Sequence, residues 1–309
     1  MECELSRDYC VGLMPEWKNL DPQIESLSGG ITNKLYRVRT SDGGDYVVRV
    51  FGTKTELFID RDIEARNLRL MESSGVTPKL IKYLPEKKAT IVEFVPGKSY
   101  QNAAFLWEEN LECLVRPIRK IHDSGLTLPR RFDPSVEVRR LCILLGKVAP
   151  EYPEFDIATT LKQLDRISEL AAVAPSEYRP CHNDLLADNF IRVEEPEKYA
   201  EPVYIIDWEY AGMSTPYYEL ADMFQEILVP RDVEEKILRI YWGDRNIDEQ
   251  IRLTDMFRPF PDIFWFLWSL IQMNISQITF DYYDYGKVKF ENAQKNIQWL
   301  SECYGLSVY

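Results

Sequence analysis

The residues best suited to chemistry lie in one short segment, HNDLLADN (residues 182–189), which has the spacing H-x-D-x-x-x-x-N. A second acid, Asp207, ends the apolar run that follows it. Phosphoryl transfer needs an acid beside the attacking hydroxyl and oxygen ligands that hold magnesium against the phosphates. Asp184 suits the first role, and Asn189 and Asp207 suit the second.

An aspartate in a loop is more often a turn residue or a helix cap, so the spacing alone is weak. The order of other features along the chain favours the catalytic interpretation. A glycine-rich turn at 28–33 comes first, the cation Arg49 lies on a later expected strand, and Glu64 lies on the next expected helix. Glu64 is the candidate partner of Arg49, with a solvated helix glutamate as the alternative.

The elements that must position these residues change in character along the chain. The pattern predicts three strands within residues 24–50, separated by turns at 28–30 and 41–44. A helix at 60–72 and two short apolar runs, 79–84 and 90–95, follow.

Helical periodicity dominates the rest of the chain. The expected helices cover 106–124, 135–148, 157–173, 233–241, 262–278 and 288–304, and two strand-like runs lie at 189–193 and 202–207. We therefore expect an α+β fold with two lobes and a cleft between them. Residues 1–96 would form a small antiparallel β lobe with one helix, and residues 97–309 a larger, mainly helical lobe.

Composition excludes several classes of function. The chain of 309 residues carries 50 acidic and 37 basic residues, a net charge of −13, which argues against nucleic acid as the partner. Its two histidines, His122 and His182, exclude a multi-histidine metal centre. The six cysteines form no C-x-x-C pair, which indicates neither a disulfide framework nor a zinc ribbon and favours a cytoplasmic location.

No membrane insertion is expected. Residues 1–20 carry charges among the apolar positions, unlike a secretory signal. The most hydrophobic stretch, 263–273, is too short to span a bilayer and is interrupted by polar residues, so it indicates a buried core helix.

Six segments together resemble the choline/ethanolamine kinase family, within the protein-kinase-like small-molecule phosphotransferases. They are SGGITNKLYRV (28–38), YVVRVFG (46–52), VEFVPGKSY (92–100), CHNDLLADNFI (181–191), IIDWEYAG (205–212) and FWFLWSLIQ (264–272). The resemblance runs over about 27–277 and implies a kinase that uses ATP and Mg²⁺ to phosphorylate a small cationic amino alcohol. Choline is the first expected substrate and ethanolamine the second. The Walker motif G-x-x-x-x-G-K-[ST] is absent.

The resemblance also implies where ATP binds. Arg49 would bridge the α- and β-phosphates, and Glu93 through Val95 would take the adenine edge from the connector between the lobes. His182 would brace the catalytic loop, and His122 would pack in the core. The turn over the phosphates would include Ser28, Gly29, Gly30, Thr32 and Asn33.

On the acceptor side, a quaternary ammonium has no N–H donors, so aromatic faces and nearby carboxylates must recognise it. The resemblance implies a cage built from Tyr210, Trp265 and Trp268, although core packing is the alternative for the two tryptophans. Gln272 lies a turn further along the same expected helix. Glu226 is the expected acid of the amine site, with Glu209 as a second candidate.

Two departures and two other functions stay open at this point. Glu219 stands where the family usually has an aspartate that supports the catalytic loop, and 228–258 does not align readily with larger relatives. A kinase for another small molecule, such as an aminoglycoside, is one alternative. A choline-binding pseudokinase module is another, but the set of Asp184, Asn189, Asp207 and Arg49 is intact. A protein-directed kinase is disfavoured because D-F-G and A-P-E segments are absent.

Overall fold

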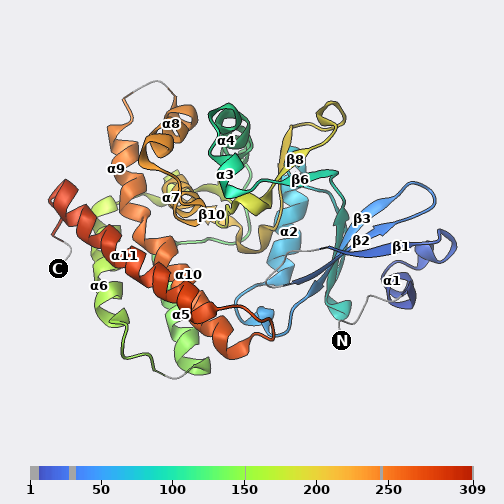
Figure 1. Cartoon of the computed structure of the whole chain (residues 1–309), viewed down its shortest axis with the longest axis horizontal. Coiled ribbons are helices and arrows are strands. Elements are labelled where there is room, and N and C mark those ends of the chain that lie inside the picture. Colours follow the sequence, from blue (N-terminus) through green and yellow to red (C-terminus); the bar gives the residue numbers. More distant parts are fainter. Residues whose placement is uncertain (1–6, 28–32, 150, 244–245, 308–309) are drawn as a thin grey trace.

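The computed structural model describes residues 7–27, 33–149, 151–243 and 246–307. It shows an α+β fold with a small antiparallel sheet lobe and a larger helical lobe (Figure 1). This is the fold class that the sequence predicts.

The sheet of the small lobe has five antiparallel strands in the order β1-β2-β3-β5-β4. Asp42 shapes the β2–β3 hairpin by accepting the backbone N–H of Gly44, while Gly43 has the positive φ of +90° that glycine tolerates. The strands are β1 (Gln23–Leu27), β2 (Asn33–Arg39), β3 (Asp45–Phe51), β4 (Leu80–Leu84) and β5 (Ala89–Glu93).

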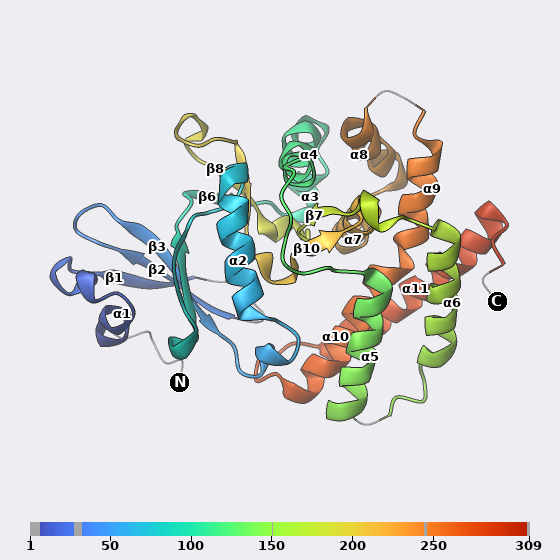
Figure 2. The same cartoon turned by 180° about the vertical axis from the view of Figure 1, so that it is seen from behind.

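Alternating side chains along β3 point to opposite faces of this sheet. Val48 packs in the cluster that also includes α1 (Arg7–Leu13), whereas Val47 packs in the cluster that includes the apolar side of α2 (Arg61–Met71). Arg49, two residues after Val47, therefore points to the α2 side. Helix α2 lies between the sheet and the large lobe in both views (Figures 1 and 2).

Two short sheets position the segment 182–189 and Asp207. Strand β6 (Gly97–Ser99) pairs with β8 (Phe190–Val193), which pairs with β9 (Val203–Ile205). Strand β7 (Arg179–Cys181) pairs with β10 (Gly212–Ser214). The segment 182–189 thus connects β7 to β8, and Asp207 follows β9.

Helix α10 lies in the core of the large lobe and packs against α5, α7 and α11, while α4 and α8 pack on each other (Figure 2). Every residue of α10 is buried except Met273 and Asn274, so the most hydrophobic stretch is a core helix. The helices are α3 (Asn102–Phe105), α4 (Glu108–His122), α5 (Pro134–Val148), α6 (Ile157–Ala171), α7 (Pro216–Ile227), α8 (Arg231–Trp242), α9 (Asp248–Phe257), α10 (Pro259–Ile275) and α11 (Tyr282–Tyr304).

Several elements differ from the sequence prediction. Helices α1, α3, α7 and α9 and the short strands β6, β7 and β10 were not predicted, so the small lobe has a second helix, α1, beside the one expected. Helix α11 begins at Tyr282 instead of 288. All of α7 except Glu226 is buried, although its acids Glu219, Asp222 and Glu226 recur at i, i+3 and i+7, which is a helical spacing that the sequence shows. Within the described ranges, no helix combines the length and apolar character needed to cross a bilayer. The five cysteines in these ranges are free thiols.

Candidate active site

The catalytic loop holds Asp184 in a buried position, 7% exposed. Burial and the nearby carboxylates of Asp222 and Asp207 raise the pKa of Asp184 well above its ordinary value. Asn189 donates from Nδ2 to the backbone carbonyl of Asp184 at 2.8 Å, which joins the two ends of the loop. Among the described residues, Asp184 Oδ1 has no hydrogen-bond partner, so this oxygen is available to a ligand.

Glu219 supports the same loop from helix α7. Its Oε1 accepts the backbone N–H groups of His182 at 2.7 Å and Asn183 at 3.2 Å, and its Oε2 contacts His122 Nε2. The longer side chain therefore reaches both backbone donors. His122 is buried as expected, but it also belongs to this brace, and its Nδ1 lies 2.5 Å from the hydroxyl of Tyr241.

His182 links the catalytic loop to the segment that ends in Asp207. Its Nε2 lies 2.8 Å from the backbone carbonyl oxygen of Ile206, and its ring packs edge-on against Trp208. Burial lowers the pKa of His182, so the ring is neutral near pH 7. A neutral, enclosed imidazole agrees with the expected bracing role.

Two residues of the site have left-handed backbone conformations that most side chains avoid. Asn183 has φ of 64° and Asp207 has φ of 69°. Such a conformation costs on the order of 1–3 kcal/mol and persists only where the surroundings enforce it. For Asn183, the enforcing contact is a hydrogen bond from Nδ2 to the backbone oxygen of Tyr210. The side chain of Asp207 stays 30% exposed.

Arg49 connects the sheet lobe to the large lobe. Its Nη1 lies 2.6 Å from Glu64 Oε1, which is the expected pair, and its Nη2 lies 2.6 Å from Asp207 Oδ1. Burial alone would lower the pKa of Arg49, but the facing carboxylates outweigh it and raise the pKa. The guanidinium is thus a fixed positive charge next to the candidate metal ligand.

A second arginine, Arg61, was missed by the sequence interpretation. It lies at the start of α2 and contacts Glu64 at 2.7 Å, Glu209 at 3.0 Å and Asn33 at 2.9 Å. Glu209 was a candidate for the amine site, but its carboxylate contacts Arg61, Asn33 and, at 3.5 Å, Arg49. The i, i+3 spacing of Arg61 and Glu64 on the expected helix could have predicted their ion pair from the sequence.

The other expected nucleotide contacts are placed only in part. Ser28, Gly29, Gly30 and Thr32 lie outside the described residues. Glu93 ends β5, and its backbone N–H donates to Lys79 O at 2.9 Å. Val95 is buried against Val193 and Tyr204 in the connector between the lobes, where the adenine contacts were expected.

Three aromatic residues expected at the acceptor site come together. Tyr210, Trp265 and Trp268 are all buried in the core cluster of the large lobe, as the core-packing alternative for the two tryptophans predicts. The ring of Tyr210 lies 5.3 Å from that of Trp265, and the two tryptophan rings lie 5.7 Å apart, both edge-on.

The backbone oxygen of Tyr210 accepts a hydrogen bond from Asn183 Nδ2 of the catalytic loop at 3.2 Å. Burial, Glu209 and Asp184 raise the pKa of Tyr210. Tyr210 Oη and Trp268 Nε1 are both buried, and the Trp268 indole N–H lowers the pKa of Tyr210 against the larger raising effect of burial.

Helix α11 adds two aromatic residues that the sequence interpretation missed. Tyr282 packs 5.9 Å from Trp268, and Tyr285 donates from its hydroxyl to Glu226 at 3.3 Å. Burial, Glu226 and Asp184 raise the pKa of Tyr285. We call Tyr210, Trp265, Trp268, Tyr282 and Tyr285 together the aromatic wall.

The expected acid of the amine site is already paired. Glu226 contacts Lys289 of α11, and both side chains are 7% exposed. The Lys289 ammonium also lies 3.9 Å from Asp262. Gln272 is buried on α10, one turn beyond Trp268. The acid is therefore present at the wall, but its charge is largely balanced by lysine.

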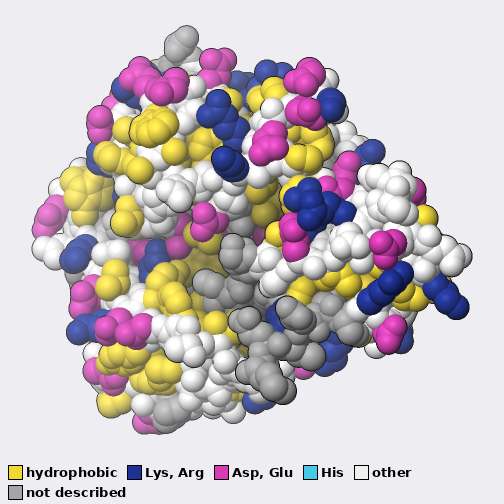
Figure 3. Space-filling model, turned by 45° about the vertical axis from the view of Figure 1, so that its right-hand side comes forward, with side chains coloured by type: hydrophobic (Ala, Val, Ile, Leu, Met, Phe, Trp, Pro, Cys, Tyr) yellow, Lys and Arg dark blue, Asp and Glu magenta, His cyan; other side chains and the backbone are white. Residues whose placement is uncertain are grey.

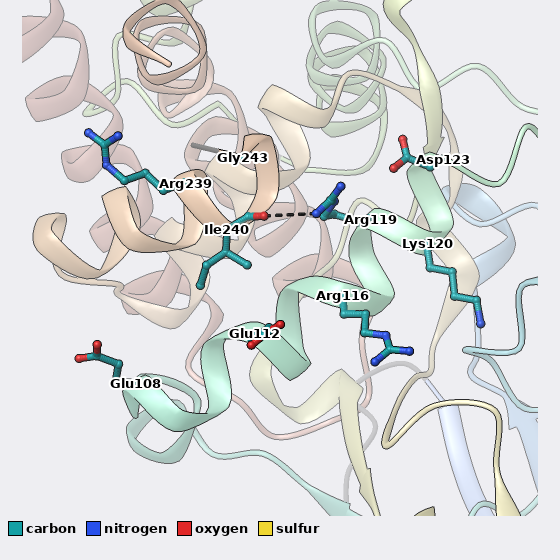
Figure 4. Close-up of a pocket in the computed structure, with 9 residues that line it drawn as sticks. All are labelled: Glu108, Glu112, Arg116, Arg119, Lys120, Asp123, Arg239, Ile240 and Gly243. Atoms are coloured by element: carbon teal, nitrogen blue, oxygen red, sulfur yellow. Dashed lines mark hydrogen bonds between the residues drawn. The ribbon is translucent and has the colours of Figure 1, made fainter. Parts of the chain in front are cut away.

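The surface between the lobes is hollowed. Figure 3 shows a depression between the β-rich lobe and the helical lobe, with hydrophobic and acidic side chains gathered around it. Elsewhere, a groove of about 890 Å³ lies between α4 and α8. In Figure 4 its walls carry charges of both signs, and Arg119 donates to the backbone oxygen of Ile240 at 3.4 Å. None of the predicted site residues lines that groove.

The fold and these contacts define a small-molecule kinase of the protein-kinase-like type, with a buried loop acid, an arginine–glutamate pair and an aromatic wall. The family model for choline/ethanolamine kinase matches residues 24–240, so the chain belongs to that family.

A relative of similar sequence agrees with this assignment, and two solved structures show the same fold. Ethanolamine kinase 2 of Mus musculus is 28% identical over 311 residues, which span 92% of this chain and 78% of that protein. Choline kinase LicA from Streptococcus pneumoniae has a TM-score of 0.77 at 24% identity, covering 95% of this chain and 100% of that chain. A choline/ethanolamine kinase family protein from Mesorhizobium loti also has a TM-score of 0.77, at 23% identity and 94% coverage of both chains.

Proposed function

We propose that the protein transfers the γ-phosphoryl group of MgATP to the hydroxyl of choline, with ethanolamine as the second candidate. The choice rests on the aromatic wall, which hydrogen bonds of Asn183 and Asp222 join to the catalytic loop, and on the pairing of the acid Glu226 with Lys289. Ring faces attract a quaternary ammonium by about 0.5–2 kcal/mol each without needing N–H donors. A primary ammonium would depend more on free acceptor groups.

The nucleotide would bind between the glycine-rich turn and Arg49. A guanidinium forks onto pairs of phosphate oxygens, and Glu64 holds Arg49 in place for that contact. The connector residues Glu93 to Val95 would take the adenine edge. A solved structure of LicA in complex with AMP, similar to this chain with a TM-score of 0.74, supports nucleotide binding by this fold.

The donor set fits magnesium, which prefers oxygen ligands. Asn189 uses Nδ2 for its bond to Asp184, which leaves its amide oxygen as a ligand, and Asp207 presents a partly exposed carboxylate. The bound ion would neutralise charge on the β- and γ-phosphates. Glu64 and Glu209 lie close to Asp207, with carboxylate oxygens within 4.8 Å of one another, and Arg49 and Arg61 balance their charge.

Within this frame Asp184 accepts the proton as the acceptor hydroxyl attacks the γ-phosphorus in line. One bond forms between the hydroxyl oxygen and phosphorus, and the bond from phosphorus to the ADP oxygen breaks. The raised pKa of Asp184 makes it a stronger base than an exposed aspartate. The braces from Glu219 and Asn189 keep it aimed at the hydroxyl.

The division of labour between the lobes follows from these roles. We place the boundary near residue 96, with the ATP-binding lobe at 1–96 and the catalytic and acceptor lobe at 97–309. The need for ATP favours a cytoplasmic location. The scattered cysteines, which form no C-x-x-C pair, favour it as well.

The test is a coupled ADP-release assay over choline, ethanolamine and their mono- and dimethylated intermediates, with an aminoglycoside as the competing substrate class. We expect the highest kcat/KM for choline. Asp184→Ala should lower kcat by about 10²–10⁴-fold while MgATP binding, measured by calorimetry, is retained. Near-normal turnover of that variant, or turnover of the aminoglycoside alone, would contradict the proposal.

A further inference from the structure

Asp222 joins the catalytic loop to the aromatic wall through a single carboxylate. It lies on α7, is 0% exposed, and accepts the indole N–H of Trp265 on Oδ1 at 2.8 Å. Its Oδ2 accepts the backbone N–H of Leu185, the residue after Asp184, at 3.3 Å. One side chain therefore spans from the base to the ring that would face the ammonium.

This acid differs from its two neighbours on α7. Glu219 contacts His122, and Glu226 contacts Lys289, so each has a basic partner. In the described part of the chain, Asp222 forms no salt bridge and relies on its two N–H donors. A buried carboxylate is costly unless such bonds satisfy it, so its geometry is closely constrained by both donors. Burial and Glu226 raise the pKa of Asp222.

We propose that Asp222 is a positioning residue that sets the separation between Asp184 and the Trp265 ring, and thereby the length of amino alcohol that the enzyme phosphorylates. The inference rests on the proposed function. An amino alcohol bound by its ammonium at the wall presents its hydroxyl at a distance fixed by its carbon chain. One extra methylene moves that hydroxyl by about 1 Å. A misplacement of that size costs about 10²-fold in rate.

Three variants separate the two hydrogen bonds of Asp222, which we call its two arms: one from the Trp265 indole and one from the Leu185 backbone. Asp222→Ala removes both hydrogen bonds. Trp265→Phe keeps a ring but removes the donor on the wall side. Asp222→Asn keeps one carbonyl oxygen and places an amide N–H₂ against the other donor, so it loses one arm only. The matched control is Asp255→Ala, because Asp255 is also a buried acid, paired with Arg231 away from the wall.

The measurement is kcat/KM for choline and for its three-carbon homologue, (3-hydroxypropyl)trimethylammonium, with ethanolamine and 3-aminopropanol as a second pair. We expect Asp222→Ala to lower kcat/KM for the two-carbon alcohol by ~10–100-fold and to affect the longer one less, so that chain-length discrimination falls. The KM for ATP should stay close to the wild-type value. Combining Asp222→Ala with Trp265→Phe should have less effect than the product of the single effects.

A merely structural role would give a different result. Asp255→Ala should lower the melting temperature and keep the wild-type chain-length ratio. If Asp222→Ala lowers stability and activity but also keeps that ratio, the inference is overturned. Should Asp222→Ala not fold, unchanged ratios in Asp222→Asn and Trp265→Phe overturn it equally. If the wild-type protein phosphorylates none of the four alcohols, the proposed function fails first, and this inference fails with it.

Discussion

Arg49 and Asp207 form a direct ion pair between the two lobes, with 2.6 Å between the guanidinium Nη2 and the carboxylate Oδ1. The expected phosphate-binding cation and the expected metal ligand are therefore in contact. In the proposed reaction, phosphate oxygens would replace Asp207 at the arginine while magnesium takes the carboxylate. The ion pair holds the Arg49 guanidinium and the Asp207 carboxylate next to each other. It also stabilises both charged forms, which burial would otherwise disfavour.

Arg49→Lys is the first test of this relationship. A lysine ammonium lacks the planar fork that reaches Glu64 and Asp207 together. We expect kcat/KM for ATP to fall ~10-fold or more, since a hydrogen bond to a charged group contributes about 1.5–3 kcal/mol. Arg39→Lys is the matched control, because Arg39 is an arginine of the same sheet whose exposed side chain pairs with Glu25. Equal effects in the two variants would contradict the assigned role.

The Glu219 brace predicts a pH dependence of stability. Burial alone would raise the pKa of Glu219, but the contact with His122 outweighs it and lowers the pKa below 4.5. A lowered pKa stabilises the fold above the unfolded-state value, and that stabilisation is lost as the pH falls through the folded-state value. Chemical denaturation between pH 7 and pH 3 should show a smaller decline in unfolding free energy for Glu219→Gln than for the wild-type protein. Parallel declines would contradict the brace.

The Glu226–Lys289 pair predicts a change in acceptor preference. Lys289→Met removes the cation and leaves Glu226 free to accept N–H groups from a primary ammonium. We expect the ratio of kcat/KM for ethanolamine to that for choline to rise about five-fold or more. The variant should also lose about 3–5 kcal/mol of stability, because a buried charge loses its partner.

A double variant separates those two effects of Lys289. Lys289→Met combined with Glu226→Gln removes both charges, so the melting temperature should recover toward the wild-type value. The preference for ethanolamine should not appear in that variant, because no carboxylate is freed. If the double variant keeps the shifted ratio, the preference does not depend on the Glu226 charge.

Position 97, in the connector between the lobes, has no room for a side chain larger than that of glycine. A Cβ at this position would lie 2.4 Å from the backbone oxygen of Arg192 on the neighbouring strand β8. Gly97→Ala should lower the unfolding free energy by about 1–3 kcal/mol, as overpacking does elsewhere. Gly146→Ala is the control, because its Cβ meets nothing within 4 Å inside helix α5 and should raise stability by about 0.5–1 kcal/mol. Denaturant titrations of both variants decide the point.

Local motifs account for what the sequence predicted well. The spacing from His182 to Asn189, and the strand that leads to Asp207, depend on neighbours in the chain, and the structure brings these residues together. The Arg49–Glu64 pair was equally accessible, because alternation along β3 and the first turn of α2 place both side chains on one face. Local patterns were sufficient there.

Contacts between distant parts of the chain explain what was missed. Lys289 is 63 residues from Glu226, so no local pattern showed that the acid is paired. Helix α7 is a different case, because Glu219, Asp222 and Glu226 recur at helical spacing and the signal for this helix was present in the sequence. The aromatic residues at 280–285 were visible in the sequence, yet only the packing of α11 on α10 shows that Tyr282 meets Trp268.

The family model ends its match at residue 240, before α10 and α11 begin. Under the proposed function, the phosphate-binding residues and Tyr210, Asp222 and Glu226 lie inside the matched stretch, whereas Trp265, Trp268, Tyr282 and Tyr285 lie after it. The C-terminal helical hairpin of α10 and α11 would then supply one side of the acceptor site and α7 the other. A chimera that exchanges only this hairpin with a relative of different preference should transplant part of that preference, and one that also exchanges α7 should transplant more.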